Sequence, residues 1–161
     1  MEADWQSVHR YASDPEVVRY MSWGPNTEEE TKGFIQRALA GQNERPRRNY
    51  TLAIVVRNEN ELIGSCSICV SNLDNREGWI GYCLNRCFWG KGYATETANA
   101  LVDFGFDKLN LHRIFATCDP ANNRVCTRSG EDWNEARRSY ARAHVGKGKM
   151  ARLFAIRDPR T

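Results

Sequence analysis

The sequence predicts one α+β domain, in which helices come first, an antiparallel meander of strands follows, and a single βαβ crossover comes last. Two changes of period support this prediction. Residues 4–39 place apolar side chains at helical spacing, whereas residues 50–84 contain three strand-like runs separated by short polar turns. The third run is followed by a glycine-rich turn, an amphipathic helix and a fourth strand-like run.

The composition is that of a globular protein with one core. The chain has 161 residues, of which 41% are apolar and 27% are charged. No run approaches the roughly 18 apolar residues that a membrane-spanning helix needs. The acidic start of the chain lacks the apolar segment of a signal peptide. We therefore expect a cytoplasmic protein with no membrane contact.

The six cysteines and three histidines do not predict a metal site. Cys66 and Cys69 form a C-x-x-C pair, but no second pair has matching spacing. They lie in a strand-like run, where positions three apart face opposite sides of the sheet. His9, His112 and His144 do not cluster in the sequence. We therefore expect free thiols in a reducing compartment and no bound metal.

Three helices are predicted in the first part of the chain. The first covers residues 4–13, and Pro15 opens a second, short helix over residues 16–21. The third begins at Thr27, which forms a Thr-x-x-Glu capping box with Glu30. The apolar stripe of the third helix consists of Phe34, Ile35, Ala38 and Leu39.

A polar, basic loop at residues 41–48 separates these helices from the strands. Turn residues occur at 58–60 and again at 72–75. The strands are predicted at residues 50–56, 62–71 and 79–84. Because both connections are short, neighbouring strands are expected to pair antiparallel.

Gly90-Lys91-Gly92 lies between the third strand and a helix that precedes a fourth strand at residues 113–118. The buried face of this helix is expected to contain Ala94, Ala98, Leu101 and Val102. A helix N-terminus presents free N–H groups and the positive end of the helix dipole, and glycine allows close approach, so the turn suits a phosphate. A plain tight turn is the alternative. Thr95 stands where a Rossmann turn needs glycine, and no Walker loop is present.

The run Trp-Ile-Gly-Tyr-Cys-Leu at residues 79–84, with Phe-Trp-Gly-Lys-Gly-Tyr-Ala-Thr-Glu at 88–96, resembles the acetyl-CoA signature of GNAT N-acetyltransferases. It is most similar to the ribosomal-protein-alanine (RimJ/RimL-type) branch. In the family pattern Arg/Gln-x-x-Gly-x-Gly/Ala, Trp89 takes the first position, Gly92 the first glycine and Ala94 the second small residue. Further similar motifs lie at residues 14–21, 111–114 and 119–122.

The resemblance implies an enzyme that moves an acetyl group from acetyl-CoA to a primary amine, either a protein N-terminus or a small amine. It implies that backbone amides of residues 89–94 hold the CoA pyrophosphate. The end of the third strand would pair with pantetheine and offer an amide to the acetyl carbonyl, and Asn122 would fix the cofactor arm. The expected cofactor-binding residues are Tyr82, Cys83, Leu84, Trp89, Gly90, Lys91, Gly92, Tyr93, Ala94 and Asn122.

The general base is less well defined by the sequence. A free α-amine has a pKa of about 8, so a weak base is sufficient near pH 7. The resemblance implies a carboxylate base on the third strand, but Trp79 occupies the expected position and Glu77 is the nearest carboxylate. Glu77 is therefore the candidate catalytic residue, with a solvated turn residue as the alternative.

The sequence departs from the family at both ends. The family opens with a strand before the first helix, and the sheet here is expected to lack that edge strand. After residue 123 the family continues with a helix and two closing strands, whereas residues 124–133 have no clear helical or strand period. Residues 1–123 carry a net charge of −3 and residues 124–161, the basic tail, carry +6.

We hypothesise that a change of coding frame near residue 124 produced the basic tail. In the frame shifted by one base, Trp133 followed by Asn134 must encode Gly, and Met150 followed by Ala151 must encode Trp. Both fall where the family expects them. From residue 124 the shifted frame permits Ala-Ser-Val-Arg-Val-Leu-Glu-Lys-Ile-Gly-Met-Lys, which resembles the missing family helix.

The sequence therefore predicts an incomplete acetyltransferase domain at residues 1–123 and an out-of-frame, poorly ordered tail at 124–161. Such a chain is expected to be weakly active or inactive. Two alternatives remain at this point: a CoA-binding remnant without chemistry, and a nucleic-acid-associated protein that uses the basic tail. We do not expect nucleic acid as the partner. Neither the acceptor nor the oligomeric state follows from the sequence.

Overall fold

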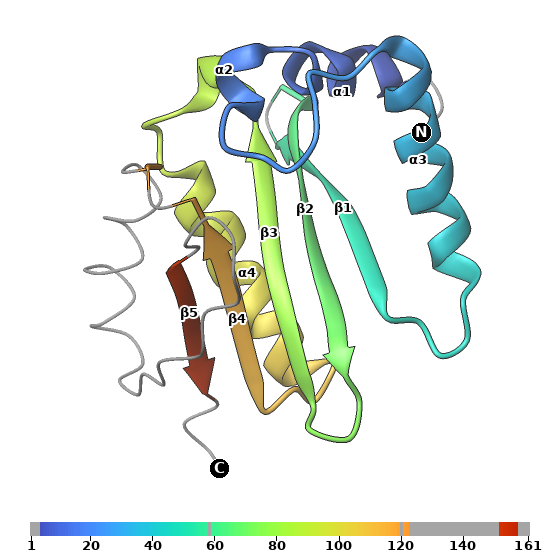
Figure 1. The fold of residues 1–161 in the computed structure, drawn as a ribbon, viewed down its shortest axis with the longest axis vertical. Coiled ribbons are helices and arrows are strands. Elements are labelled where there is room, and N and C mark those ends of the chain that lie inside the picture. The colour runs from blue at the N-terminus through green and yellow to red at the C-terminus, as the bar shows by residue number, and fades with distance from the viewer. Residues whose placement is uncertain (1–3, 58, 120, 123–151, 158–161) are drawn as a thin grey trace.

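The computed structural model describes residues 4–57, 59–119, 121–122 and the backbone of 152–157 (Figure 1). The helices are α1 (Trp5–Ala12), α2 (Pro15–Val18), α3 (Glu28–Ala40) and α4 (Tyr93–Asp107), with short 3-10 turns η2 (Gly41–Asn43) and η3 (Arg86–Phe88). The strands are β1 (Asn49–Val56), β2 (Glu61–Asn72), β3 (Glu77–Leu84), β4 (Arg113–Cys118) and β5 (Arg152–Arg157).

The sheet has the strand order β1-β2-β3-β4-β5. Strand β2 pairs antiparallel with β1 and with β3, as the two short turns predict. Strand β4 pairs parallel with β3, because α4 returns the chain across one face of the sheet before β4 begins. The predicted α+β fold, with its meander and one βαβ crossover, is therefore confirmed.

The predicted elements differ from the structure at two places. The helix expected over residues 16–21 ends at Val18. The buried Val18 accepts a hydrogen bond from the Met21 N–H at 2.8 Å, which turns the chain out of the helix.

The tail contains a strand that the sequence prediction omitted. Strand β5, an apolar run between two arginines, pairs antiparallel with β4 and completes the hydrogen bonds of that edge. The prediction that no closing strand is present is therefore wrong for these residues. The rest of the tail, and its predicted disorder, lie outside the described residues. The sequence also predicts that the edge strand before the first helix is missing. Of the residues that precede α1 the structure describes Asp4 alone, and it forms no strand beside β1.

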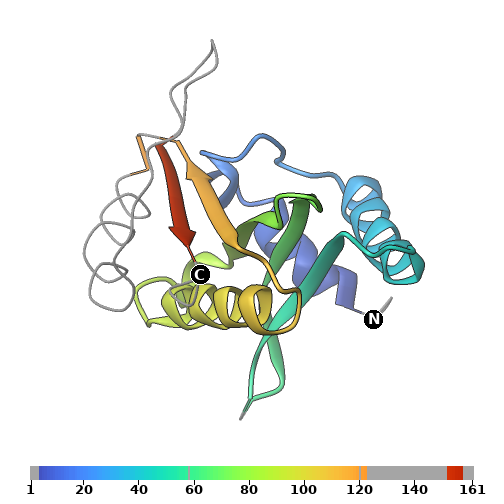
Figure 2. The same ribbon diagram turned by 90° about the horizontal axis from the view of Figure 1, so that it is seen from below.

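Helices cover both faces of the sheet (Figure 2). On one face, α4 buries Leu101, Val102 and Phe106 against β2, β3 and β4. Gly105 allows this close approach, since an added Cβ would lie 2.6 Å from the Cδ1 atom of Ile114. On the other face, α1 packs on β2 and α3 packs on α1. The face predicted for the fourth helix is confirmed.

The capping box at the start of α3 is present as predicted. The Thr27 hydroxyl accepts from the Glu30 N–H at 3.2 Å, and the Glu30 carboxylate accepts from the Thr27 N–H at 2.8 Å. The Thr27 carbonyl also accepts from the hydroxyl of Thr31, the one fully buried residue of this helix.

We expect Thr27→Ala to lower the free energy of unfolding by about 1 kcal/mol, because the first turn of α3 loses a capping acceptor. Urea unfolding followed by circular dichroism measures the change. Thr27→Ser, which keeps the hydroxyl, is the control and should remain close to the unmodified protein. Equal losses in the two variants would show that the methyl group, not the cap, stabilises this helix.

Candidate active site

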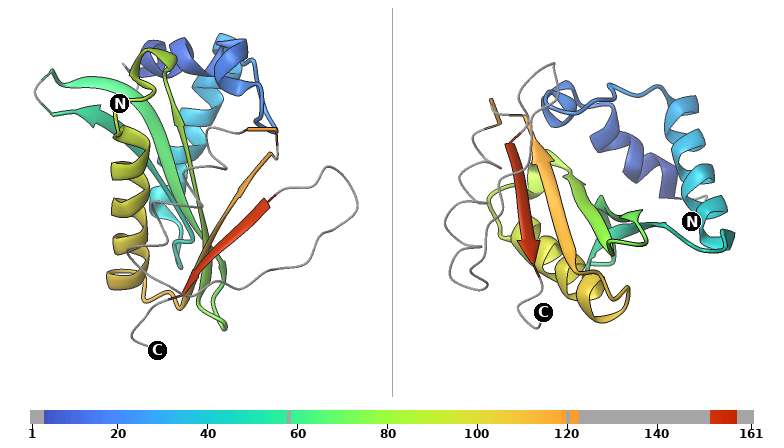
Figure 3. Two further views of the ribbon diagram at one scale, coloured as in Figure 1. Left: turned by 90° about the vertical axis from the view of Figure 1, so that its left-hand side faces the viewer. Right: turned by 60° about the horizontal axis from the view of Figure 1, so that its bottom comes forward.

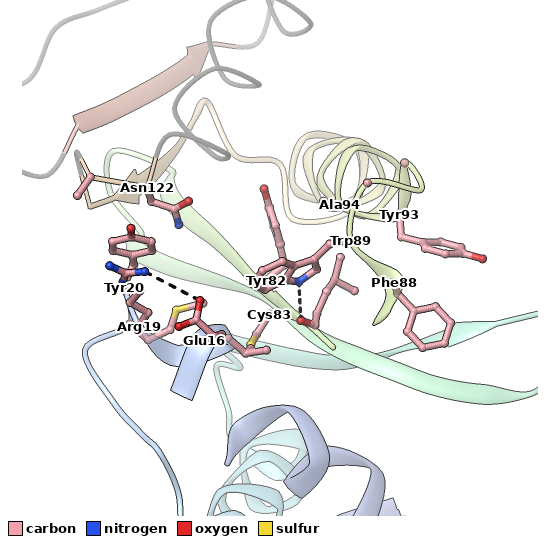
Figure 4. A pocket seen from close by; sticks show the side chains of 16 residues that line it. Glu16, Arg19, Tyr20, Tyr82, Cys83, Phe88, Trp89, Tyr93, Ala94 and Asn122 are labelled. Atoms are coloured by element: carbon pink, nitrogen blue, oxygen red, sulfur yellow. Dashed lines mark hydrogen bonds and ion pairs between the residues drawn. The ribbon is translucent and has the colours of Figure 1, made fainter. Parts of the chain in front are cut away.

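A pocket of about 730 Å³ lies at the C-terminal end of β3. Its walls come from β3, the turn before α4, helix α2 with the residues that follow it, and the turn after β4 (Figure 4). Nine of the ten predicted cofactor-binding residues line it: Tyr82, Cys83, Leu84, Trp89, Gly90, Gly92, Tyr93, Ala94 and Asn122. The fold thus brings together residues that are up to 40 positions apart in the sequence.

The pocket opens where β3 and β4 separate. The two strands pair over three residues, from Glu77 opposite Arg113 to Trp79 opposite Phe115. Strand β3 continues to Leu84 and β4 to Cys118, and the two diverge toward these ends (Figures 1 and 3). A ligand can therefore lie along the edge of β3 where β4 no longer covers it.

The hydrogen-bond pattern of β3 shows which peptide groups face this opening. The Asn85 N–H donates to the Ile63 carbonyl at 2.8 Å. In an antiparallel ladder, hydrogen-bonded pairs alternate with pairs whose peptide groups point to the outer edge. Leu84, which lies opposite Gly64, belongs to the second kind. Its N–H and carbonyl therefore point toward the opening between β3 and β4.

The glycine turn forms the second wall. Gly90 and Gly92 have φ angles of 79° and 88°, which glycine adopts without strain, and no atom lies within 4 Å of the position that a Cβ would take. Gly92 caps α4 without a side-chain hydrogen bond. Among the described residues, the turn's amides make no backbone hydrogen bond from residue 90 to 94, and such bonds resume at Thr95. Amides of this kind, at the N-terminus of a 15-residue helix, are suited to bind an anion.

Unlike the amides of the glycine turn, the two N–H groups of Trp89 both have acceptors within the protein. Its backbone N–H donates to the Arg86 carbonyl at 3.1 Å, and its indole N–H donates to the Leu84 carbonyl at 2.9 Å. Both donors are therefore already used within the protein. The amides that can meet a phosphate are those of residues 90–94, one fewer than the resemblance implied.

Lys91 is the predicted cofactor residue that does not line the pocket. Its Nζ atom lies 5.0 Å from the centre of the Phe88 ring, and this ring meets Tyr93 edge to face. The charge of Lys91 therefore lies over the Phe88 ring, and Lys91 does not form part of the pocket wall.

Asn122 enters the pocket from the turn that follows β4. Its N–H donates to the Asp119 carbonyl at 2.9 Å, and the Asp119 carboxylate accepts from the Ala121 N–H at 2.9 Å. This turn places the Asn122 side chain across the opening from β3 (Figure 4). Asn122 thus lines the pocket, and its role in fixing the cofactor arm stays a prediction.

The wall formed by α2 was missed by the sequence reasoning. Glu16, Arg19 and Tyr20 line the pocket, and the carboxylate of Glu16 lies 4.0 Å from the Arg19 guanidinium. Their motif at residues 14–21 had been recognised, but a single turn of helix gives no signal of which face meets a ligand. Glu16 is the one carboxylate among the described pocket residues.

Glu77 does not belong to the pocket. It lies at the opposite end of β3, six residues or about 20 Å from Cys83 along the strand. Its carboxylate accepts a hydrogen bond from the Arg113 guanidinium at 3.1 Å, and this ion pair joins the paired ends of β3 and β4. The structure therefore places Glu77 in the sheet framework, outside this pocket, and its role as the base stays a prediction.

The buried thiol of Cys83 is chemically inert in this wall. Burial raises its pKa to about 12, and burial likewise raises the pKa of Cys66 to about 11. Near neutral pH both groups are therefore neutral thiols, and thiolates are the nucleophilic form. Cys83 therefore offers no thiolate nucleophile to an acyl group bound in this pocket.

We expect Cys83 to resist alkylation in the folded protein. At pH 8 a pKa of about 12 leaves roughly one thiol in 10⁴ ionised. Iodoacetamide followed by peptide mass mapping should label the exposed Cys87 at least a hundredfold faster. After unfolding in urea the two rates should converge. Rapid labelling of native Cys83 would contradict the burial described here.

Within the described residues, no cluster of metal-ligating side chains occurs and no helix is long and apolar enough to cross a membrane.

The GNAT acetyltransferase domain model matches residues 1–129. Two uncharacterised N-acetyltransferases are similar: YnaD of Bacillus subtilis (36% identity) and p20 of Bacillus licheniformis (39%). These matches cover 74% and 70% of this chain and 66% and 63% of the relatives.

Among solved structures, a GNAT-family acetyltransferase from Bacillus anthracis has a TM-score of 0.72 and 29% identity. The comparison covers 98% of this chain and 90% of that one. Fold, site geometry and the match of the family model agree, and the chain belongs to the GNAT acetyltransferase family.

Proposed function

We propose that this protein binds acetyl-CoA in the pocket and transfers its acetyl group to a primary amine. One observation supports this most strongly: the open edge of β3 and four residues of the glycine turn, Gly90, Gly92, Tyr93 and Ala94, line the same pocket. An extended amide-bearing arm suits a strand edge, and a pyrophosphate suits a helix N-terminus. Acetyl-CoA, the usual donor in this family, carries both groups in one molecule.

In the proposed reaction, the neutral amine attacks the thioester carbonyl. A C–N bond forms, the C–S bond breaks, and the thiolate of CoA leaves with the electron pair of that bond. The amine proton passes to water or to Glu16, the carboxylate in the pocket wall. The Leu84 N–H, which points into the opening, is placed to stabilise negative charge on the carbonyl oxygen.

The acceptor is proposed to be a protein N-terminus, because the motif resembles the ribosomal-protein-alanine branch. A small amine is the second candidate, and a relative of 26% identity, the spermidine N(1)-acetyltransferase of Escherichia coli, supports it. Both present an uncharged amine when deprotonated. The free thiols among the described residues fit a reducing compartment, so we place the reaction in the cytoplasm.

We expect Gly92→Ala to weaken acetyl-CoA binding about tenfold. A side chain at a φ of 88° costs roughly 1–2 kcal/mol, so the free turn should relax away from the conformation that the proposed phosphate site requires. Acetyl-CoA should raise the melting temperature of the unmodified protein, and this shift should shrink in the variant. Gly41→Ala is the matched control, because Gly41 has an ordinary φ of −59° and lies outside the pocket.

Two outcomes would contradict the proposal. If acetyl-CoA does not stabilise the unmodified protein, the pocket is not a CoA site. If Gly92→Ala binds as tightly as Gly41→Ala, the glycine turn is not the phosphate site. Stabilisation without any acetylated product from a peptide or spermidine acceptor would indicate a CoA-binding remnant.

We also propose that residues 124–161 are translated from a shifted frame. The match of the family model ends at residue 129, close to the proposed change, which supports the idea. The relative YoaA of Bacillus subtilis is the opposing observation, since it aligns at 30% identity over 99% of this chain. On this proposal the chain with the present sequence has a low acetyltransferase turnover, because residues 124–161 replace the closing part of the domain.

The gene sequence from codon 110 past the stop codon tests this proposal directly. We expect the frame shifted by one base to encode Leu-Glu-Lys-Ile-Gly-Met shortly after Asn123. The frame-corrected protein should then show higher acetyltransferase turnover than the present chain at equal CoA affinity. Stop codons in that frame would refute the proposal and make the basic tail a genuine part of the protein.

A further inference from the structure

We infer that Trp89 is a positioning residue that fixes the glycine turn against β3, so that one ligand can engage both. The inference rests on the proposed function and goes beyond it. The general family pattern has Arg or Gln at this position, a side chain that could itself meet a phosphate, although tryptophan is similar to what the resembled branch often carries. In this chain the position holds an indole whose only N–H is used internally.

The hydrogen bond from Trp89 joins the two parts of the site. The indole N–H donates at 2.9 Å to the Leu84 carbonyl, which points toward the opening between β3 and β4. This carbonyl is therefore the last acceptor on the edge that is proposed to take pantetheine. The next residue after Trp89 is Gly90, the first amide of the anion site.

Packing holds the indole from two sides. Trp89 packs against the cluster that contains Val17 and Cys83, below the α2 wall. It also packs against the cluster that contains Leu84 and Ala94, at the start of α4. The indole thus packs between the end of β3, the start of α4 and helix α2. Its rotation would break the hydrogen bond to the Leu84 carbonyl.

The chain between these parts, residues 85–89, is tied at its start to β2 and α2: the Asn85 N–H donates to the Ile63 carbonyl at 2.8 Å, and the Arg86 guanidinium lies 3.5 Å from the Asp14 carboxylate. Its other hydrogen bonds are short-range. In η3, the Asn85 side chain accepts from the Cys87 N–H at 3.0 Å, and the Trp89 N–H donates to the Arg86 carbonyl. These bonds shape the turn but do not join it to the edge of β3. The indole supplies that connection, and it sets the spacing between the strand edge and the phosphate amides.

A spacing role predicts a specific pattern of affinities. A ligand that occupies only one half of the site does not depend on the spacing, whereas intact acetyl-CoA does. Loss of the indole N–H also leaves the Leu84 carbonyl without its partner. We therefore expect Trp89→Phe to raise the Kd of acetyl-CoA about tenfold. The Kd values of acetyl-pantetheine and of the adenosine bisphosphate half of CoA should remain nearly unchanged.

Trp89→His is the matched variant, because the Nε2 atom of imidazole superposes on the indole Nε1 when the five-membered rings are aligned. It keeps an N–H at this point and loses the second ring, while Trp89→Phe keeps aromatic bulk and loses the N–H. At pH 8, the histidine variant should bind acetyl-CoA more tightly than the phenylalanine variant. Trp5→Phe is the control for general destabilisation, because Trp5 is a half-buried tryptophan on α1 that lies outside the pocket.

Calorimetry with the three ligands, together with thermal unfolding of each variant, completes the test. Equal weakening of all three ligands in Trp89→Phe would overturn the inference, since it would reveal a merely structural role. Unchanged acetyl-CoA affinity would overturn it as well. If the unmodified protein binds neither acetyl-CoA nor its halves, the proposed function itself is refuted. This result differs from the two outcomes above, because those are seen only in the Trp89→Phe variant.

Discussion

The separation of β3 and β4 after three residue pairs is the constraint on which the site depends. A continuous ladder would fill the outer edge of β3 with strand hydrogen bonds. Because the pairing stops at Trp79, the later peptide groups of β3 face a pocket instead. The ion pair of Glu77 and Arg113 lies where the strands still pair, and it ties this end together. The same sheet is thus closed at one end and open at the other.

The second half of the site follows from the crossover that makes β4 parallel. A parallel connection requires a long crossover, which here is α4, and the N-terminus of α4 then lies beside the C-terminal end of β3. The two positive-φ glycines keep the amides before α4 exposed. Strand edge and anion site are therefore neighbours by topology, and Trp89 determines how closely they fit.

The pocket wall also limits the chemistry. Burial keeps Cys83 as a neutral thiol, and the glutamate expected to act as base lies at the far end of its strand. What remains near the opening is a set of backbone amides, tyrosines and one carboxylate that faces an arginine. Such a site is suited to a reactive donor and an acceptor that needs little activation, as in direct transfer from a thioester to an amine.

The sequence by itself determined the order of elements, the antiparallel meander, the capping box at Thr27, the buried face of α4 and the glycine turn. These features depend on local periodicity and on residues a few positions apart. The tertiary structure decided the rest: the α2 wall, the β5 pairing, the placement of Glu77 outside the pocket and the internal use of both Trp89 donors. Strand divergence and helix approach set these distances, and no pattern along one segment encodes them.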